Sequence, residues 1–167
     1  MSSIPEIEIA PGVFVPKIGI GTWGMGGYMT KSPYNDDEND VAQIKYQLER
    51  GLRAIDCWLA QAEGRTLQII ARAIKGFPRE KLFLVGKFDV KNYVSQGNLE
   101  SVANQYLKIL GVDYLDLIQI HVPQYLGLSM EDCVDEMNNL VEKGKAKFFG
   151  MSNSNKETRP HIVCEYT

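Results

Sequence analysis

The sequence contains no uninterrupted apolar run of about 18 residues, the length at which a helix can cross a membrane. Its apolar stretches are short and are separated by charged or turn residues, so we expect no membrane partner. No charged-then-apolar leader precedes Ile4, and we therefore expect a cytoplasmic protein. The 18 Lys and Arg against 21 Asp and Glu form neither a basic stripe nor an acidic block, which argues against nucleic acid as a partner.

Cysteine is scarce as well. Cys57, Cys133 and Cys164 are odd in number and lack the CxxC or Cys/His spacing of a zinc site or a disulfide framework. We expect them to be small buried apolar side chains, and we expect no metal site. The glycine-rich stretch 21–27 also lacks the G-x-G-x-x-G spacing of a Rossmann fold.

The sequence does contain a regular alternation of strand and helix patterns, which we assign to one domain, residues 1–167. Alternating polar and apolar residues on either side of Pro11–Gly12 predict an N-terminal hairpin. Short apolar strands then alternate with amphipathic helices, which implies a parallel sheet with helical crossovers. Five strands are expected, with a weaker sixth at the end: Ile18–Ile20, Leu52–Asp56, Lys81–Lys87, Tyr114–Ile120, Lys147–Met151 and Ile162–Cys164.

Capping signals mark the helix ends. The acidic run Asp36–Glu38 predicts the start of the first helix, and Ser129, with an acidic residue three positions later, predicts the start of the fourth. Gly76 and Gly111 are placed to end the second and third helices, because glycine readily adopts the left-handed conformation that closes a helix. The predicted class is therefore α/β.

Polar side chains stand at the carboxyl ends of successive predicted strands. These residues are Asp56, Lys87, His121 and the pair Ser152 and Asn153. In βα proteins this end of the strands faces the ligand, so the side chains are expected to meet at a common centre. Each one alone is also compatible with a solvated rim charge or a structural hydrogen bond. An aspartate beside a lysine favours the charged form of both and can polarise a nearby hydroxyl group.

The segments around these strand ends resemble, in order and spacing, the successive strand blocks of the aldo-keto reductases. The similarity extends from about Ile7 to Asn153, and the segments that carry it are Gly21–Gly24, Ala54–Asp56, Gly76–Lys87, Gly111–His121 and Gly150–Asn153. The resemblance implies a (β/α)₈ TIM-type barrel that binds NADP(H) without a Rossmann domain and reduces carbonyl compounds. We therefore expect an incomplete barrel of five to six βα units, preceded by the N-terminal β-hairpin.

The resemblance also assigns roles to individual positions. The family's catalytic tetrad consists of Asp, Tyr, Lys and His, of which Asp56, Lys87 and His121 match three. The loop beside the nicotinamide and the residues that hold its carboxamide are the expected cofactor-binding positions, and they correspond to Gly21, Thr22, Trp23, Ser152 and Asn153.

The active-site segment departs from the family pattern. Where the family has Asp-Thr-Ala-x-x-Tyr-Gly, Gln61 occupies the catalytic position of the tyrosine. A glutamine amide has no proton to give near neutral pH, so the general acid is missing. Trp58 replaces a small side chain, Gly86 stands where threonine is common, and Val122 follows the histidine. We expect these changes to surround one remodelled cavity.

The length of the chain matters for the cofactor. A (β/α)₈ barrel needs roughly 200 to 250 residues, so the seventh and eighth strands are not expected within these 167 residues. In the family those strands supply the basic residues that hold the cofactor's phosphates. We therefore expect NADP(H) binding to be weak or lost, and we expect weak or absent reductase activity on a small-molecule carbonyl substrate.

Two alternatives remain open. In a remodelled, cofactor-free site, Lys87 would form a Schiff base with a carbonyl substrate in an apolar pocket lined by Trp23, Trp58 and Val122, although Asp56 opposes this by keeping the amine protonated. In the other, the chain is a non-catalytic partial-barrel scaffold. In either case the open sheet edges predict self-association.

Overall fold

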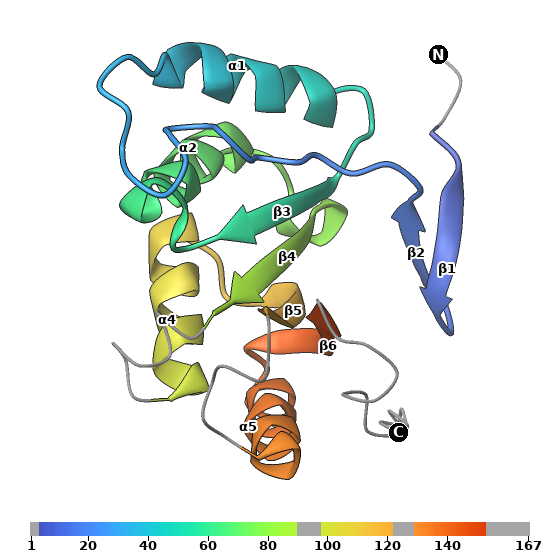
Figure 1. Ribbon diagram of the computed structural model, residues 1–167. Coiled ribbons are helices and arrows are strands. Elements are labelled where there is room, and N and C mark those ends of the chain that lie inside the picture. Colours follow the sequence, from blue (N-terminus) through green and yellow to red (C-terminus); the bar gives the residue numbers. More distant parts are fainter. Residues whose placement is uncertain (1–3, 90–97, 122–128, 153–167) are drawn as a thin grey trace.

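The computed structural model describes residues 4–89, 98–121 and 129–152. It opens with an antiparallel hairpin of β1 (Glu6–Ala10) and β2 (Val13–Pro16), whose register pairs Glu6 with Pro16. Gly12 makes the turn with φ of +74°, a conformation that side chains disfavour. The predicted hairpin is therefore confirmed. It packs beside the amino-terminal ends of the main strands, apart from the helices (Figure 1).

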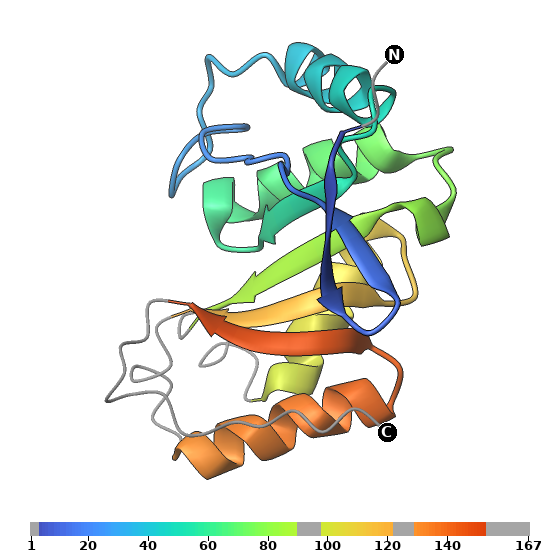
Figure 2. The ribbon, with the colours of Figure 1, turned by 90° about the vertical axis from the view of Figure 1, so that its right-hand side faces the viewer.

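The main sheet has four parallel strands whose spatial order follows the chain (Figure 2). These strands are β3 (Ala54–Trp58), β4 (Phe83–Phe88), β5 (Leu115–His121) and β6 (Ala146–Ser152). Between successive strands the chain passes through a helix on the outer side of the sheet (Figure 1). The arrangement is a partial βα barrel, as predicted.

The predicted strand Ile18–Ile20 forms only an isolated bridge, in which Ile20 pairs with Ile55 in parallel. The Ile20 amide donates to the Ala54 carbonyl at 2.7 Å, and the Asp56 amide donates to the Ile20 carbonyl at 3.1 Å. The glycine-rich loop begins at the next residue and carries the chain away from β3, so no longer ladder forms. The predicted sixth strand, Ile162–Cys164, lies outside the described residues.

The helices start and stop close to where the capping signals predict. They are α1 (Asp37–Leu48), α2 (Arg65–Ile74), α4 (Leu99–Leu110) and α5 (Met130–Glu142), with short 3₁₀ turns η1 (Gln61–Gly64) and η2 (Arg79–Lys81). The side chains of Asp36 and Ser129 accept from the amides three residues on, as N-caps do. Gly111 ends α4 in the left-handed conformation.

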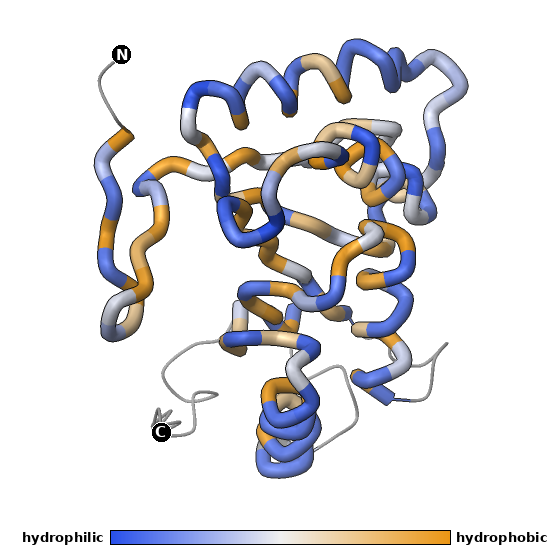
Figure 3. Tube along the Cα trace, turned by 180° about the vertical axis from the view of Figure 1, so that it is seen from behind, coloured by the Kyte–Doolittle hydropathy of each residue, from blue (hydrophilic) through white to orange (hydrophobic). Residues whose placement is uncertain are grey.

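The hydrophobic core lies between the sheet and the helices. Ile55 on β3, Leu84 on β4 and Ile118 on β5 are fully buried and belong to this core. Hydrophobic and hydrophilic residues alternate along the helices, as Figure 3 shows. Cys57 and Cys133 are free, buried thiols, which confirms that prediction for both, while Cys164 lies outside the described residues.

Because side chains alternate across a strand, the residues between the core positions face the opposite, inner side of the sheet. This inner face is the one that a complete barrel would enclose. Within the described ranges, no helix is long and apolar enough to cross a membrane.

Candidate functional site

An open cleft of about 590 Å³ occupies the inner face of the sheet. This volume lies in the range of pockets that hold small molecules. Apolar side chains form its floor, and polar groups gather at the carboxyl ends of the strands. The lining residues are Gly19, Ile20, Gly21, Ala54, Ile55, Asp56, Val85, Lys87, Leu117, Gln119, His121 and Ser152.

Asp56 and Lys87 come together across the first strand pair. Parallel pairing of β3 with β4 sets Asp56 beside Val85 and Trp58 beside Lys87, so the two side chains share one face of the sheet. The Lys87 Nζ lies 2.8 Å from the Asp56 Oδ2, and both side chains remain partly accessible from the cleft. The predicted acid and ammonium therefore form a direct ion pair.

His121 and Ser152 form a second pair on the neighbouring strands. They are register partners at the ends of β5 and β6, and the His121 Nδ1 lies 3.0 Å from the Ser152 Oγ. Which of the two donates depends on the imidazole tautomer. The His121 ring also lies 5.7 Å from the Trp58 ring, measured between centroids. The four predicted site residues at the strand ends thus line one cleft, whereas Asn153 lies outside the described residues.

The glycine-rich loop forms one wall of the cleft, with Gly21 at the lining. Thr22 is buried behind it, and its hydroxyl donates to the Asp56 carbonyl at 2.9 Å. Thr22 therefore fixes the loop to β3 and does not line the cleft. Trp23, the next residue, is exposed and stacks on Trp58 with ring centroids 5.7 Å apart.

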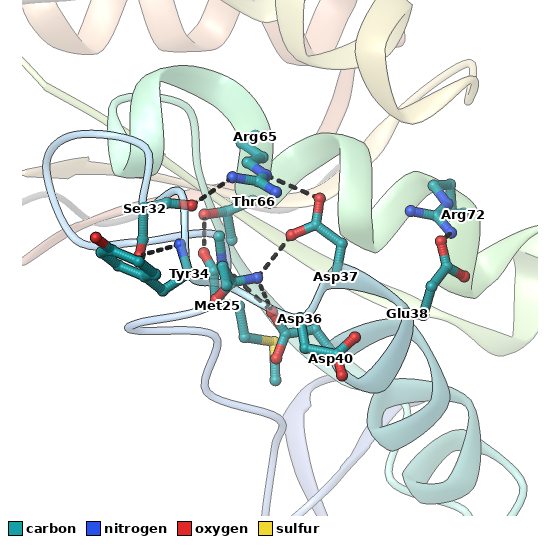
Figure 4. A network of polar contacts seen from close by, with 12 residues as sticks. Met25, Ser32, Tyr34, Asp36, Asp37, Glu38, Asp40, Arg65, Thr66 and Arg72 are labelled. Atoms are coloured by element: carbon teal, nitrogen blue, oxygen red, sulfur yellow. Dashed lines mark hydrogen bonds and ion pairs between the residues drawn. The ribbon is translucent and has the colours of Figure 1, made fainter.

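Two helices hold the same loop from outside, as Figure 4 shows. The Arg65 guanidinium binds the Asp37 carboxylate at 2.8 Å and the Ser32 carbonyl at 2.7 Å. The Thr66 hydroxyl donates to the Met25 carbonyl at 2.6 Å. Burial by itself raises the pKa of Asp37, but hydrogen bonds from Arg65 and Asn35 outweigh it and hold this pKa below its usual value.

Gln61 does not join the ion pair in the cleft. Its side chain is buried, and its Nε2 donates to the Thr22 carbonyl at 2.6 Å. The position predicted to be catalytic therefore serves to hold the glycine-rich loop. The next two residues, Ala62 and Glu63, have φ of +46° and +52°, which side chains normally avoid. This left-handed pair redirects the chain from β3 into α2.

Gly86 was expected to border the cavity, and this expectation is wrong. Gly86 alternates with Val85 and Lys87 along β4, so it faces the helical layer. A Cβ atom at this position would lie 2.7 Å from the Leu115 Cδ1 and 3.6 Å from the ring of Tyr106. Gly86 thus makes room for core side chains. Val122 lies outside the described residues.

Tyr106 is a residue of this site that sequence reasoning missed. It lies on α4 and is fully buried, yet its hydroxyl reaches the strand ends. The Leu59 amide donates to it at 2.8 Å, and the hydroxyl itself donates to the Lys87 carbonyl. Burial raises the pKa of Tyr106 well above its usual value, so the phenol stays protonated. In the sequence its spacing is that of an ordinary helix core residue.

Comparison with known proteins accounts for this arrangement. The model of the aldo/keto reductase family matches residues 17–161. The aldo-keto reductase YhdN of Bacillus subtilis is 31% identical over 150 residues, which are 85% of this chain and 44% of the relative. Methylglyoxal reductase YeaE of Escherichia coli is 31% identical over 147 residues, or 88% of this chain and 49% of the relative.

Solved structures give the same result. A thermostable aldo-keto reductase in complex with the inhibitor epalrestat superimposes with a TM-score of 0.80 at 31% identity, covering 92% of this chain and 56% of the other. An aldo-keto reductase from Klebsiella pneumoniae in complex with NADPH superimposes with a TM-score of 0.75 at 28% identity, covering 87% and 48%. The chain spans about half the length of the relatives it matches. It belongs to the aldo/keto reductase family.

Proposed function

We propose that the cleft is the carbonyl-binding site of an NADP(H)-dependent oxidoreductase, and that this chain by itself has weak or no reductase activity. The observation that carries the proposal is the Lys87–Asp56 ion pair at 2.8 Å, set in one cleft with the His121–Ser152 pair. Two groups that can donate to a carbonyl oxygen, an ammonium and an imidazole, thereby lie on strands that neighbour each other in the sheet.

Each of these groups has a defined task in this proposal. The Lys87 ammonium donates a hydrogen bond to the substrate's carbonyl oxygen and stabilises the negative charge that grows on it during reduction. Asp56 holds that ammonium in place through the ion pair at 2.8 Å. His121, held through its Nδ1 by Ser152, orients the same oxygen from the other side.

The cofactor fits the described residues in part. Gly21 and Ser152, which the resemblance assigns to the nicotinamide, both line the cleft, and bound NADPH would supply the hydride. Among the described residues that line the cleft, Lys87 is the one lysine or arginine, and Asp56 already neutralises it. The cofactor's phosphates therefore meet no free cation there, which supports weak binding.

The position of Gln61 supports low turnover as well. A general acid contributes about 10²–10⁴ to the rate of such a reaction. The Gln61 amide is engaged with the Thr22 carbonyl and has no ionisable proton. In this proposal, Gln61 stands in place of the phenol that gives up a proton in the family's tetrad.

The Schiff-base alternative gains no support from the geometry. A lysine attacks a carbonyl with a free amine, whereas the Lys87 side chain is engaged in an ion pair with Asp56. The scaffold alternative is compatible with self-association, which we also propose. After Ala146, no residue of β6 is fully buried, and Val85 and Leu117 line an open cleft. A second chain would cover both surfaces.

We also place the protein in the cytoplasm. Cys57 and Cys133 are free thiols, and in a reducing compartment such thiols persist.

Two measurements test the proposed function. Titration with NADPH, followed by its fluorescence, is expected to give a dissociation constant in the millimolar range or no binding, and micromolar binding would contradict the proposed weakness. Turnover of para-nitrobenzaldehyde at saturating NADPH is then compared between the wild type, Lys87→Met and the exposed control Lys45→Met. Any activity of the wild type should disappear in Lys87→Met alone. Measurable activity that is equal in all three would refute the assignment of the cleft.

A further inference from the structure

Three aromatic rings form a continuous row that ends beside two cleft residues, Lys87 and His121, and we call Tyr28, Trp23 and Trp58 the aromatic platform. The Trp23 and Trp58 rings are stacked, with centroids 5.7 Å apart and planes inclined by 24°. Tyr28 continues the row, with its centroid 5.4 Å from that of Trp23. The two tryptophans are the only ones in the chain, so every indole ring of the protein lies in this platform.

Trp58 places the platform next to the polar groups of the cleft. It is the last residue of β3 and shares the inner face of the sheet with Asp56, two positions earlier. Its ring centroid lies 5.7 Å from the Lys87 Nζ and 5.7 Å from the His121 ring. Its Nε1 donates to the Asp89 Oδ2 at 2.5 Å, which fixes the orientation of the indole.

The platform is not part of the hydrophobic core. Neither tryptophan belongs to the core cluster or to the partly buried side chains packed against it. Trp23 is 59% exposed and Tyr28 is 64% exposed, although both rings are large and apolar. A structural role would bury these faces. Exposed aromatic faces beside a polar cleft are instead typical of a binding surface.

The charge around the platform limits the ligands that it can take. Asp56 neutralises the Lys87 ammonium, and the carboxylate of Asp89 is engaged by the Trp58 indole. Neither an anionic nor a cationic ligand therefore meets a free counter-charge among the described groups around Trp58. A neutral ligand with a carbonyl oxygen can accept from Lys87 and still lay a flat ring against the platform.

We propose that Trp58 is a specificity-determining residue, and that the cleft prefers neutral, planar aromatic ketones and aldehydes to saturated compounds of the same carbon skeleton. The preference rests on the proposed function, because it assumes that Lys87 holds the carbonyl oxygen. Its physical origin is stacking, which adds to the affinity of an aromatic ring beyond the apolar area that it buries.

The test compares acetylnaphthalene with acetyldecalin, its saturated counterpart, in the full chain. The two indole N–H signals in a heteronuclear NMR spectrum report on the platform alone, and Trp58→Phe assigns them. We expect both signals to shift with acetylnaphthalene, and we expect its affinity to be about three- to tenfold higher than that of acetyldecalin. Trp58→Ala should abolish this ratio by weakening the aromatic ligand, whereas Trp58→Phe should keep most of it.

Two further variants distinguish a failure of the proposed specificity role from a failure of the proposed carbonyl site. Tyr46→Ala removes an exposed aromatic ring from α1 and should leave both affinities unchanged. Lys87→Met should weaken both ketones and preserve their ratio. Equal affinities of the wild type for the two ketones, or a ratio that survives Trp58→Ala, would overturn the specificity role. An unchanged affinity in Lys87→Met, with the aromatic preference intact, would instead refute the proposed carbonyl site and leave the platform standing.

Discussion

Tyr106→Phe removes a single oxygen atom from the core, and we expect it to lower the stability of the protein measurably. The phenol hydroxyl accepts from the Leu59 amide and donates to the Lys87 carbonyl, so one atom of α4 ties the end of β4 to the segment that follows β3. Phenylalanine keeps the ring, which stacks on Phe88 with centroids 5.0 Å apart. The substitution therefore isolates the polar contribution.

The size of the effect follows from burial. A buried polar group that loses its partner costs about 1–3 kcal/mol, and here two backbone groups lose the same partner. Partial relaxation of the strand ends reduces the sum, so we expect the free energy of unfolding to fall by about 2–3 kcal/mol. For a chain of this size, that corresponds to a decrease in Tm of roughly 4–12 °C.

Urea unfolding followed by circular dichroism, at one fixed protein concentration, measures this loss. Tyr46→Phe is the matched control, because Tyr46 is 57% exposed, and the free energy of unfolding should then change by less than about 0.5 kcal/mol. If Tyr106→Phe is as stable as this control, the hydroxyl does not hold the strand ends together.

Three other outcomes are expected. Gln61→Tyr should not restore the reduction of para-nitrobenzaldehyde, because position 61 faces the buried Thr22 carbonyl, and robust turnover would show that the phenol is the main deficit. Light scattering coupled to size exclusion at micromolar concentration should give a mass above that of the 18.8 kDa monomer, and a stable monomer would contradict the proposed self-association. The pKa of Asp37 is lowered in the folded state, so its contribution to stability is complete above its unfolded pKa of about 3.9 and is lost as the pH falls through the folded pKa. Acid unfolding of Asp37→Asn should therefore depend less on pH below about 4, and an unchanged profile would show that the Arg65 contact does not contribute.

Much of the fold could be predicted from local signals. Asp36 and Ser129 cap helices because their side chains replace missing backbone partners, and this chemistry is visible in the sequence. The strand at Ile18–Ile20 could not be judged in the same way. Whether a short apolar segment forms a ladder or a single bridge depends on where the following loop leads, and that is decided by distant contacts such as the one between Thr22 and β3.

The site residues that lie on the strands could be predicted from the sequence. Asp56 and Lys87 share a face because adjacent parallel strands in this register align residues of the same parity. The orientations of Gln61 and Gly86 could not be predicted in the same way. The pattern gives the position of a residue along the chain, but the direction of the Gln61 side chain depends on the left-handed residues Ala62 and Glu63, and no sequence signal marks these. Tyr106 was missed because its hydroxyl acts across the core from a helix.

In the main sheet the strands lie side by side in the same order as they occur in the chain, and this order matters for folding during translation. Each strand pairs with the strand that precedes it, so every new βα unit can dock on a surface that has already left the ribosome. Asp56 and Lys87 belong to the first such pair, and their ion pair can form before β5 and β6 are made. His121 and Ser152 are added by the later pair. The strand order thus allows the polar cleft to be assembled from one end to the other in the order of translation.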